Sequence, residues 1–542
     1  MGLNSGKVFL VGAGPGDYRL ITCRGKDLLA AADVVVYDRL IDPRLLALAR
    51  PQAELLYVGK GGDGKGASQE EINDLLVAHA GRGKMVVRLK GGDPFLFGRG
   101  GEEAETLVAA GIPFEVVPGV TSALSVPAYA GIPVTHRRVA SSVHVVTGHE
   151  DPGKQEDTVR WSELASSGGT IVVLMGIENI RAITGKLVAA GLDPSTPAAL
   201  IQRGTTAAQR CIVDVVGRIA ERAVESDLRP PVVMVVGEVV RLRDRLAWRE
   251  GLPLSGRRIL VTRPSERSAS LTALIESLGG EAWTVPAVRI VPRPEPPETA
   301  DVVRGWGSYR WIVLTSPTSV EIFFSFLAQQ RLDLRRAGVF RLAAVGRGTA
   351  EALGSRGLFP DVVPDGGSTA DLAPLLASGI EPGDGAASCA AQVGPRDKLP
   401  HRLSDDGPQA ALLPRGNLAS RELQEALAAR GMLAQPLTLY DTLPETLPAY
   451  ALEALAAGAI DAAVLTSPSG ARVLAAALNG GAEAAAASRT GAPSAFPSPR
   501  CVCIGEVTAE AARSEGLDVR GVAARPGDEE MVGSLIEILS QE

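Results

Sequence analysis

The second half of the chain repeats itself. The run WIVLTSPTSVEIF at 311–323 returns as AAVLTSPSGARVL at 462–474, and LAAVGRGTAEALGSRGL at 342–358 returns as CVCIGEVTAEAARSEGL at 501–517. Each copy begins with an apolar run typical of a buried strand and continues into a helical pattern. Because both motifs recur in the same order, 256–542 is predicted to form two similar α/β lobes.

The repeat also predicts where a ligand would bind. Two such lobes enclose a cleft, and Thr and Ser at helix N-termini facing it suit anionic groups. A single TSP turn is equally explained as a helix cap, so only its paired occurrence favours a functional reading.

Short apolar runs alternate with helical patterns in the first half as well. SQEEINDLLVAHA at 68–80 opens with Ser68 and Glu71 in capping-box spacing, and apolar runs such as TIVVLMG at 170–176 read as strands. The whole chain is therefore predicted to be α/β. Gly251, Pro253 and Gly256 interrupt the pattern, which predicts a linker at 249–256 between domains at 1–250 and 256–542.

Composition excludes several classes of protein. The 542 residues are 45% hydrophobic and 22% charged, with a net charge of -7, which argues against general nucleic-acid binding. Neither a membrane-spanning run nor a signal-peptide pattern is seen, so a cytoplasmic protein is expected. The five His lie outside metal-binding motifs, so no metal site is expected. Cys501 and Cys503 are interpreted as buried residues on one face of a strand.

A glycine loop, VGAGPGD at 11–17, follows the first apolar run. Its glycines are spaced GxGxG, whereas a dinucleotide fingerprint needs GxGxxG. Pro15 has no N–H to offer a phosphate, so the loop suits a neutral or cationic ligand better than an anionic one. A plain strand-to-helix turn remains an alternative at this point.

A second glycine-rich stretch, VRLKGGDPFLFGRGGEEAETL at 87–107, carries two glycine clusters close together. Glycines at this density favour close approach of a ligand to the backbone. Further strands that end in small or hydroxyl residues are expected to wall the same pocket.

These motifs, together with VVVYDRL, VGK, VVPGVTSA, GIPVTHR, VTGHE and VMVVGEVVRLRDRLAW, resemble uroporphyrinogen-III C-methyltransferase of the tetrapyrrole methylase family, over residues 5–248. The resemblance implies a two-subdomain methylase fold, a homodimer formed through this half, and S-adenosylmethionine as the cofactor, whose sulfonium cation agrees with the phosphate-free loop. The cofactor contacts that it implies are Pro15, Gly91, Gly92, Asp93, Leu96, Thr121, Ser122, Met175 and Gly204.

The same resemblance implies that Asp38 is the proton acceptor and Lys60 the proton donor. Methylation of a pyrrole carbon ends with loss of a ring proton, for which a carboxylate is a suitable base. A turn residue at Asp38 and a solvated charge at Lys60 are the alternatives. Uroporphyrinogen carries eight carboxylates, so cations near the loops are expected to pair with some of them. Arg99 and His136 are the candidate substrate contacts, and Arg88, Lys90, Arg137 and Arg138 lie nearby in sequence.

ILVTRP, VLTSPTSV, AVGRGTAEAL, GSTADLAPLL, LYDTLP and IGEVTAEAA resemble uroporphyrinogen-III synthase over 256–542. That resemblance implies two α/β lobes between which the chain crosses, a short connecting ladder and no cofactor. The implied substrate contacts are Thr315, Ser316, Thr349, Ser467 and Thr508, and Tyr440 is interpreted as an acid that assists departure of hydroxide, with ordinary packing as the alternative. Long loops are expected at 381–409 and 481–499.

The product of the implied synthase is the substrate of the implied methylase. The sequence therefore predicts a bifunctional tetrapyrrole enzyme that converts hydroxymethylbilane to uroporphyrinogen III and then to precorrin-2, toward sirohaem or cobalamin. Two alternatives remain open: a methylase for a later precorrin, and a methylase whose C-terminal half binds a tetrapyrrole without turning it over.

Overall fold

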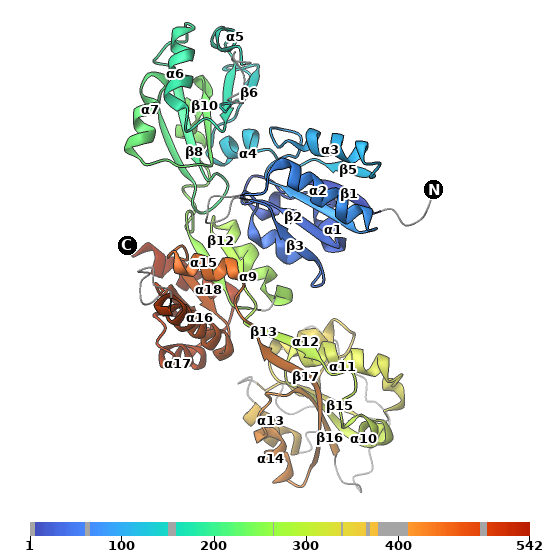
Figure 1. Cartoon of the computed structure of the whole chain (residues 1–542). Coiled ribbons are helices and arrows are strands. Elements are labelled where there is room, and N and C mark those ends of the chain that lie inside the picture. The colour runs from blue at the N-terminus through green and yellow to red at the C-terminus, as the bar shows by residue number, and fades with distance from the viewer. Residues whose placement is uncertain are drawn as a thin grey trace. The chain divides into compact units, whose positions relative to one another are not determined.

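The computed structural model describes residues 6–59, 66–149, 159–263, 265–337, 340–364, 369–377, 410–487 and 496–541. The chain forms two compact units, one of Met1–Pro286 with Leu447–Glu542 and one of Ala287–Thr446. Figure 1 labels their helices and strands. None of the helices in these ranges is long and apolar enough to cross a membrane.

The first unit begins with a parallel sheet of order β3-β2-β4-β1-β5. Side chains of β1 alternate between two buried clusters, with Val8 and Leu10 on one face and Phe9 and Val11 on the other, so helices cover both faces. The predicted capping box is confirmed: Ser68 and Glu71 bond reciprocally at the start of α2. The elements are β1 (Lys7–Gly12), α1 (Cys23–Ala31), β2 (Val34–Tyr37), β3 (Glu54–Tyr57), α2 (Gln69–Gly81), β4 (Met85–Lys90), α3 (Gly100–Ala109) and β5 (Phe114–Val117).

A second, mixed sheet of order β6-β7-β10-β8-β9 follows in the same unit. Only β6 and β7 run parallel in it, and β7, β10 and β8 are apolar and buried on both faces. Figure 1 shows α6 and α7 beside this sheet. Its elements are α4 (Ser122–Tyr129), β6 (Val143–Thr147), α5 (Trp161–Ser166), β7 (Thr170–Leu174), α6 (Ile180–Ala189), β8 (Pro197–Gln202), β9 (Arg210–Val215), α7 (Val216–Glu225), β10 (Val232–Val236) and α8 (Arg243–Leu246).

The first unit also contains one lobe of the repeat, a parallel sheet of order β12-β11-β18-β19-β20. Cys501 and Cys503 are fully buried in one apolar cluster of this lobe, as predicted from their alternation on a strand. The elements are β11 (Arg258–Val261), α9 (Ser265–Ser277), β12 (Glu281–Thr284), α15 (Ala449–Ala456), β18 (Ala462–Leu465), α16 (Pro468–Ala487), β19 (Arg500–Cys503), α17 (Glu506–Ser514), β20 (Val519–Val522) and α18 (Asp528–Ser540).

The second unit holds the other copy, with strand order β13-β17-β16-β14-β15. The order β17-β16-β14-β15 repeats β12-β11-β18-β19, and each TSP turn joins a strand to a helix, which confirms the predicted two-lobed architecture. The additional strand β13 pairs antiparallel with β17. The elements are β13 (Val288–Pro292), α10 (Thr299–Arg304), β14 (Tyr309–Leu314), α11 (Pro317–Gln329), β15 (Arg341–Ala344), α12 (Arg347–Gly354), α13 (Thr369–Ala377), β16 (Ala410–Gly416), α14 (Glu422–Ala428) and β17 (Leu433–Pro444).

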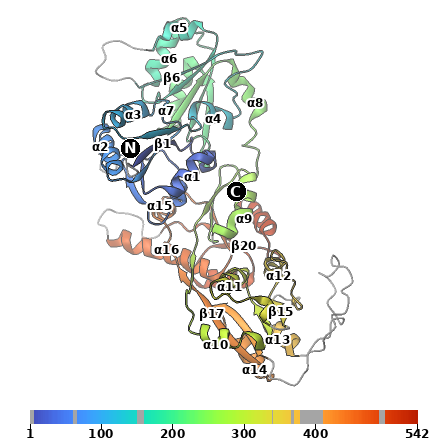
Figure 2. The same cartoon turned by 90° about the vertical axis from the view of Figure 1, so that its right-hand side faces the viewer.

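Three connections were predicted from the sequence: loops at 381–409 and 481–499 and a linker at 249–256. The loop predicted at 481–499 was wrong at its start, because α16 continues to Ala487 (Figure 2). The alanines after 481 have the highest helix propensity and extend the helix past Gly480 and Gly481. The loop predicted at 381–409 lies outside the described residues. The segment predicted as a linker is packed: Leu254 is fully buried and Arg249 donates to the Gly279 carbonyl.

Candidate functional site

Three turns meet at the carboxyl edge of the first sheet, where β1, β4 and β5 end. A Cβ at Gly12 would lie 2.4 Å from Cα of Gly119 and 2.6 Å from the carbonyl oxygen of Gly92. The Gly92 N–H donates to the Gly14 carbonyl at 2.7 Å. The glycines are therefore required for the backbones to touch, and they leave the outer faces of these turns open to a ligand, as is usual at this edge of an α/β sheet.

The carboxylate of Asp93 holds these turns in place. Its Oδ1 accepts the N–H groups of Phe95 and Leu96, and its Oδ2 accepts the N–H of Gly119 at 3.0 Å. Both oxygens of this predicted cofactor contact are thus used within the protein. Asp93 shapes the pocket by joining the turn after β4 to the turn after β5.

The second subdomain closes the same region. Gly204, which follows β8, packs against Val126 of α4, and Oγ1 of Thr205 accepts the N–H of Asp17 at 3.0 Å. Thr121 caps α4, whose first residue is Ser122. The structure thus brings together eight of the nine predicted cofactor contacts on adjoining turns: Pro15, Gly91, Gly92, Asp93, Leu96, Thr121, Ser122 and Gly204.

Met175 is the ninth and stands apart in its exposure. It follows β7, with half of its surface exposed and a left-handed backbone (φ 56°). Arg203 and Thr205, on either side of Gly204, also have positive φ, at 46° and 71°. Such conformations are strained for residues with side chains and persist only where surrounding contacts fix them.

A buried charge network lies behind Asp38. Arg88 Nη2 lies 3.4 Å from Asp38 Oδ2, while Arg88 Nε and Lys90 Nζ both bond to Oε1 of Glu103, at 3.2 and 2.8 Å. Glu103 is fully buried, and the side chains of Arg88 and Lys90 are 5% exposed. Burial, with the neighbouring Arg88 charge, lowers the pKa of Lys90 despite the Glu103 carboxylate.

This network corrects one expectation and adds a residue. Arg88 and Lys90 were expected among the cations near the substrate, but their bonds to Glu103 occupy them inside the protein. Glu103 was not predicted from the sequence. Its signal was the alternation of Arg88 and Lys90, which places both on one face of β4 and requires a buried counter-charge.

Arg99 and His136 remain accessible. Arg99 precedes α3 with φ 57°, pairs with Glu102 at 2.7 Å, and keeps 57% of its side chain exposed. That hydrogen bond to Glu102 raises the pKa of Arg99. His136 is exposed in a turn closed by Ala140. The predicted proton donor Lys60 lies outside the described residues.

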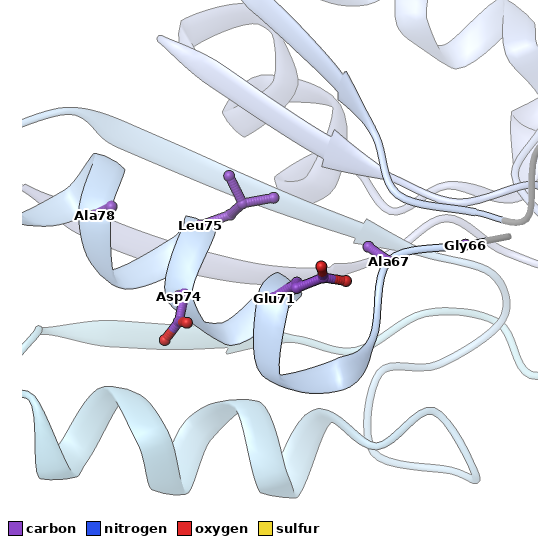
Figure 3. A pocket seen from close by; sticks show the side chains of 6 residues that line it. All are labelled: Gly66, Ala67, Glu71, Asp74, Leu75 and Ala78. Carbon is purple, nitrogen blue, oxygen red and sulfur yellow. The ribbon is translucent and has the colours of Figure 1, made fainter.

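Two hollows lie on the methylase-like part. Figure 3 shows the side chains that line the wider one, about 660 Å³, beside the start of α2: Gly66, Ala67, Glu71, Asp74, Leu75 and Ala78. Its two carboxylates would repel a polycarboxylate ligand. The other, about 420 Å³, is lined by Phe97 and by residues of β6 and α5, and the Arg160 in its wall pairs with Glu163 at 3.0 Å.

In the second unit, Tyr440 and the TSP turn come together. The Tyr440 hydroxyl lies 3.4 Å from Oγ of Ser316. Thr315, the residue before Ser316, comes directly after the last residue of β14. Tyr440 is 8% exposed, and its ring covers Gly416, where a Cβ would lie 2.5 Å from the ring. Thr349 of α12 is 2% exposed and donates to the carbonyl of Val345, which precedes that helix, so its hydroxyl is used within the protein.

The corresponding residues of the other lobe lie in the first unit. Oγ of Ser467 accepts the N–H of Gly470 at the start of α16 and lies 2.9 Å from Oγ of Ser469. Thr508 is 4% exposed in α17. In both lobes the threonine and the serine of the TSP turn are partly exposed, whereas the threonine of the second motif is buried.

Comparison with known families assigns the N-terminal and C-terminal parts of the chain to different families. The family model of tetrapyrrole (corrin/porphyrin) methylases matches residues 7–220. The model of uroporphyrinogen-III synthase HemD matches residues 269–409 and 398–533.

Individual proteins match the same parts. The porphyrin biosynthesis protein HemD of Ruminiclostridium josui is 43% identical over 363 residues, which are 67% of this chain and 72% of that protein. An S-adenosyl-L-methionine-dependent uroporphyrinogen III methyltransferase of Methanosarcina barkeri is 52% identical over 243 residues, 45% of this chain and 95% of that protein. The chain spans about half the length (54%) of the siroheme synthase of Stutzerimonas stutzeri, which it also matches.

Among solved structures, the uroporphyrin-III C-methyltransferase of Thermus thermophilus in complex with S-adenosyl homocysteine is 44% identical. The match covers 44% of this chain and 94% of that one, with a TM-score of 0.38. The chain thus belongs to the tetrapyrrole methylases through its N-terminal part and to the uroporphyrinogen-III synthases through its C-terminal part.

Proposed function

We propose that the chain carries two consecutive activities of tetrapyrrole biosynthesis. The C-terminal half closes hydroxymethylbilane to uroporphyrinogen III with inversion of ring D, and the N-terminal half methylates that product twice to precorrin-2. The observation that carries the proposal is the presence, in one chain, of matches to both families whose reactions follow one another.

The proposed cofactor of the methylase half is S-adenosylmethionine, which supplies a methyl group on a sulfonium cation. The glycine turns of 12–16 and 91–92 present bare backbone, and Pro15 removes a donor that a phosphate would need. Leu96, Thr121, Ser122 and Gly204 would complete the pocket that holds this cofactor. This donor set fits a cofactor without phosphates.

Asp38 is the proposed proton acceptor of this half. Its side chain is 26% exposed; Oδ2 faces Arg88, and Oδ1 accepts the N–H of Leu40 at 3.0 Å, so a ligand proton would use a remaining lone pair of this carboxylate. Arg88 and Lys90 carry two positive charges, of which Glu103 balances one, and the Asp38 carboxylate supplies the second negative charge while Arg88 orients it. Arg99 and His136 are proposed to pair with substrate carboxylates.

In the synthase half, catalysis is proposed to come mainly from binding the linear substrate in the conformation in which its ring closes. The hydroxyls of Ser316 and Ser467 and the N-termini of α11 and α16 suit a substrate with many carboxylates. Tyr440 is proposed to protonate the departing hydroxide, since its hydroxyl lies beside Ser316. No cofactor is proposed for this half. We also propose that the chain forms a homodimer through the methylase half, which light scattering on the purified protein would test.

Turnover of hydroxymethylbilane by the purified chain tests the proposal, with and without S-adenosylmethionine, separating type I and type III isomers. We expect type III product without the cofactor, and a dimethylated product once it is added. If only the spontaneous type I isomer forms while supplied uroporphyrinogen III is still methylated, the C-terminal half binds tetrapyrroles without catalysis. If a later precorrin is methylated instead, the assigned substrate of the methylase is wrong.

A further inference from the structure

Two carboxylates of the synthase lobe in the first unit are buried against the methylase part. Glu276 lies in the last turn of α9 and Glu281 begins β12, and the tight turn at Gly279 and Gly280 separates them. Their side chains are only 5% and 7% exposed. Buried carboxylates are retained where they are paired. The partners of Glu276 and Glu281 therefore show which segments of the methylase part this turn contacts.

Glu281 reaches a loop of the methylase. Its Oε2 accepts the N–H of Ala207 at 2.7 Å, and its Oε1 lies 3.5 Å from Nη2 of Arg44. Within its own lobe it accepts bonds from Arg258 and Trp283. These positive charges and donors, chiefly Arg258 and Arg44, outweigh burial and keep the pKa of Glu281 below its ordinary value, so it is an anion at neutral pH.

Ala207 lies three residues after Gly204, in the loop proposed to contact the cofactor. That loop carries the strained residues Arg203 and Thr205 and is closed by a bond from the Thr205 N–H to Oε1 of Gln209, at 2.8 Å. Strained backbone holds its shape only while outside contacts fix it. A charged acceptor from another domain is one such contact.

Glu276 reaches the other cofactor loop. Its Oε2 lies 3.0 Å from Nη1 of Arg19, whose Nε lies 3.5 Å from the Asp17 carboxylate. Asp17 ends the glycine loop, and its N–H donates to Oγ1 of Thr205. A Cβ at Gly16 would lie 2.9 Å from the same Oγ1, so the two loops are in direct contact.

We propose that Glu276 and Glu281 are positioning residues for the S-adenosylmethionine pocket, supplied by the synthase lobe. They touch neither cofactor nor substrate. They fix the loops at 12–19 and 203–209 in the geometry that binds the cofactor, so the methylase depends on the lobe fused to it. This inference rests on the proposed methylase function.

The test uses the full chain and compares Glu281→Ala, Glu281→Gln and Asp461→Asn. Asp461 is the matched control, because its carboxylate pairs with Arg257 and accepts the backbone N–H of Arg258 inside the same lobe. With uroporphyrinogen III as acceptor, Glu281→Ala should raise the KM for S-adenosylmethionine about tenfold while kcat stays within about twofold, because a charge-assisted bond that shapes the pocket is lost. Glu281→Gln keeps an oxygen acceptor for Ala207 and should stay within about threefold of wild type. Asp461→Asn should leave KM unchanged.

Two results would overturn the inference alone: an unchanged KM in Glu281→Ala, or an equal rise in Asp461→Asn. A wild-type chain that neither binds nor uses S-adenosylmethionine would overturn the proposed methylase as well. Hydrogen exchange on the wild-type chain decides the matter even if Glu281→Ala does not fold. Saturation with S-adenosylhomocysteine should slow exchange at 203–209 and also at 278–284, and slowing at 203–209 alone contradicts the coupling.

Discussion

The strands β12 and β17 occupy the same place in the two copies of the repeat, yet their outer edges are covered differently. Each follows a helix, α9 or α14, and pairs in parallel with the strand that precedes that helix, β11 or β16. On β17 the outer edge is covered by β13, which pairs with it from Val288 to Pro292. β12 is the last strand of its sheet, and Arg44 of the methylase part donates to the Ala282 carbonyl at 2.8 Å.

An uncovered strand edge presents unpaired backbone groups, so both copies need a cover. A backbone ladder gives the second unit a cover that is independent of charge. The first unit uses a buried cation instead, with Asp42, Glu276 and Glu281 around it. The difference teaches that a fused domain can replace a strand as edge cover, and that the replacement is sensitive to mutation and to pH.

Removal of the cation at the β12 edge should cause the largest loss in the free energy of unfolding. Arg44→Met keeps the side-chain volume but leaves three buried carboxylates short of a partner and the Ala282 carbonyl without its donor. Breaking a buried ion pair by removing one partner costs about 3 to 5 kcal/mol. Urea unfolding followed by tryptophan fluorescence should show this loss in the transition of the first unit. A loss below about 1 kcal/mol would mean that the edge is not held by charge.

The pH dependence of stability should come next in size. Burial outweighs the attraction of Arg19 and Arg44 and raises the pKa of Glu276 to about 7. An acid whose pKa is raised on folding contributes stability below its ordinary value near 4.5, and that stability is lost as the pH rises through 7. Wild type should therefore lose on the order of 2 kcal/mol between pH 5 and pH 8.

Glu276→Gln provides the comparison for that measurement. Glutamine resembles the protonated acid, so this variant should show a flatter profile over the same pH range in thermal or urea unfolding. A parallel loss in wild type and variant would assign the pH dependence to other groups.

Much of the architecture was predictable because it depends on local pattern. The repeated TSP and TA motifs gave the paired lobes, Ser68 and Glu71 gave a helix start, and the alternation of Cys501 and Cys503 gave a buried strand. Each depends on residues a few positions apart, and their spacing follows from helix or strand geometry.

The parts that escaped prediction depend on contacts between distant segments. Glu103 lies 15 residues from Arg88, and Glu281 lies 74 residues from Ala207. The sequence around Glu281 does not distinguish it from a solvated carboxylate, and the one signal for Glu103 is the alternation of Arg88 and Lys90 on β4. The cofactor contacts were likewise predicted only from the resemblance to a family, without the positions of these residues relative to one another. The residues after β4, β1 and β5 meet because these strands are parallel neighbours, and Gly204 reaches them from the turn after β8 of the other sheet.

Substitution of a charged residue at the β17 edge is expected to have the smallest effect on stability. Arg293 donates two bonds to Asp441, at 2.9 and 2.6 Å, but both side chains are partly exposed and the backbone ladder already covers the edge. Arg293→Met should therefore shift the unfolding midpoint of the second unit only within measurement error, and less still in concentrated salt. Its pH signature should have the opposite sign to that of Glu276. The hydrogen bond from Arg293 lowers the pKa of Asp441, so the stabilisation is present above pH 4 and disappears as the pH falls below it. A midpoint shift as large as that of Arg44→Met would show that the ladder alone does not cover this edge, and the contrast between the two lobes would fail.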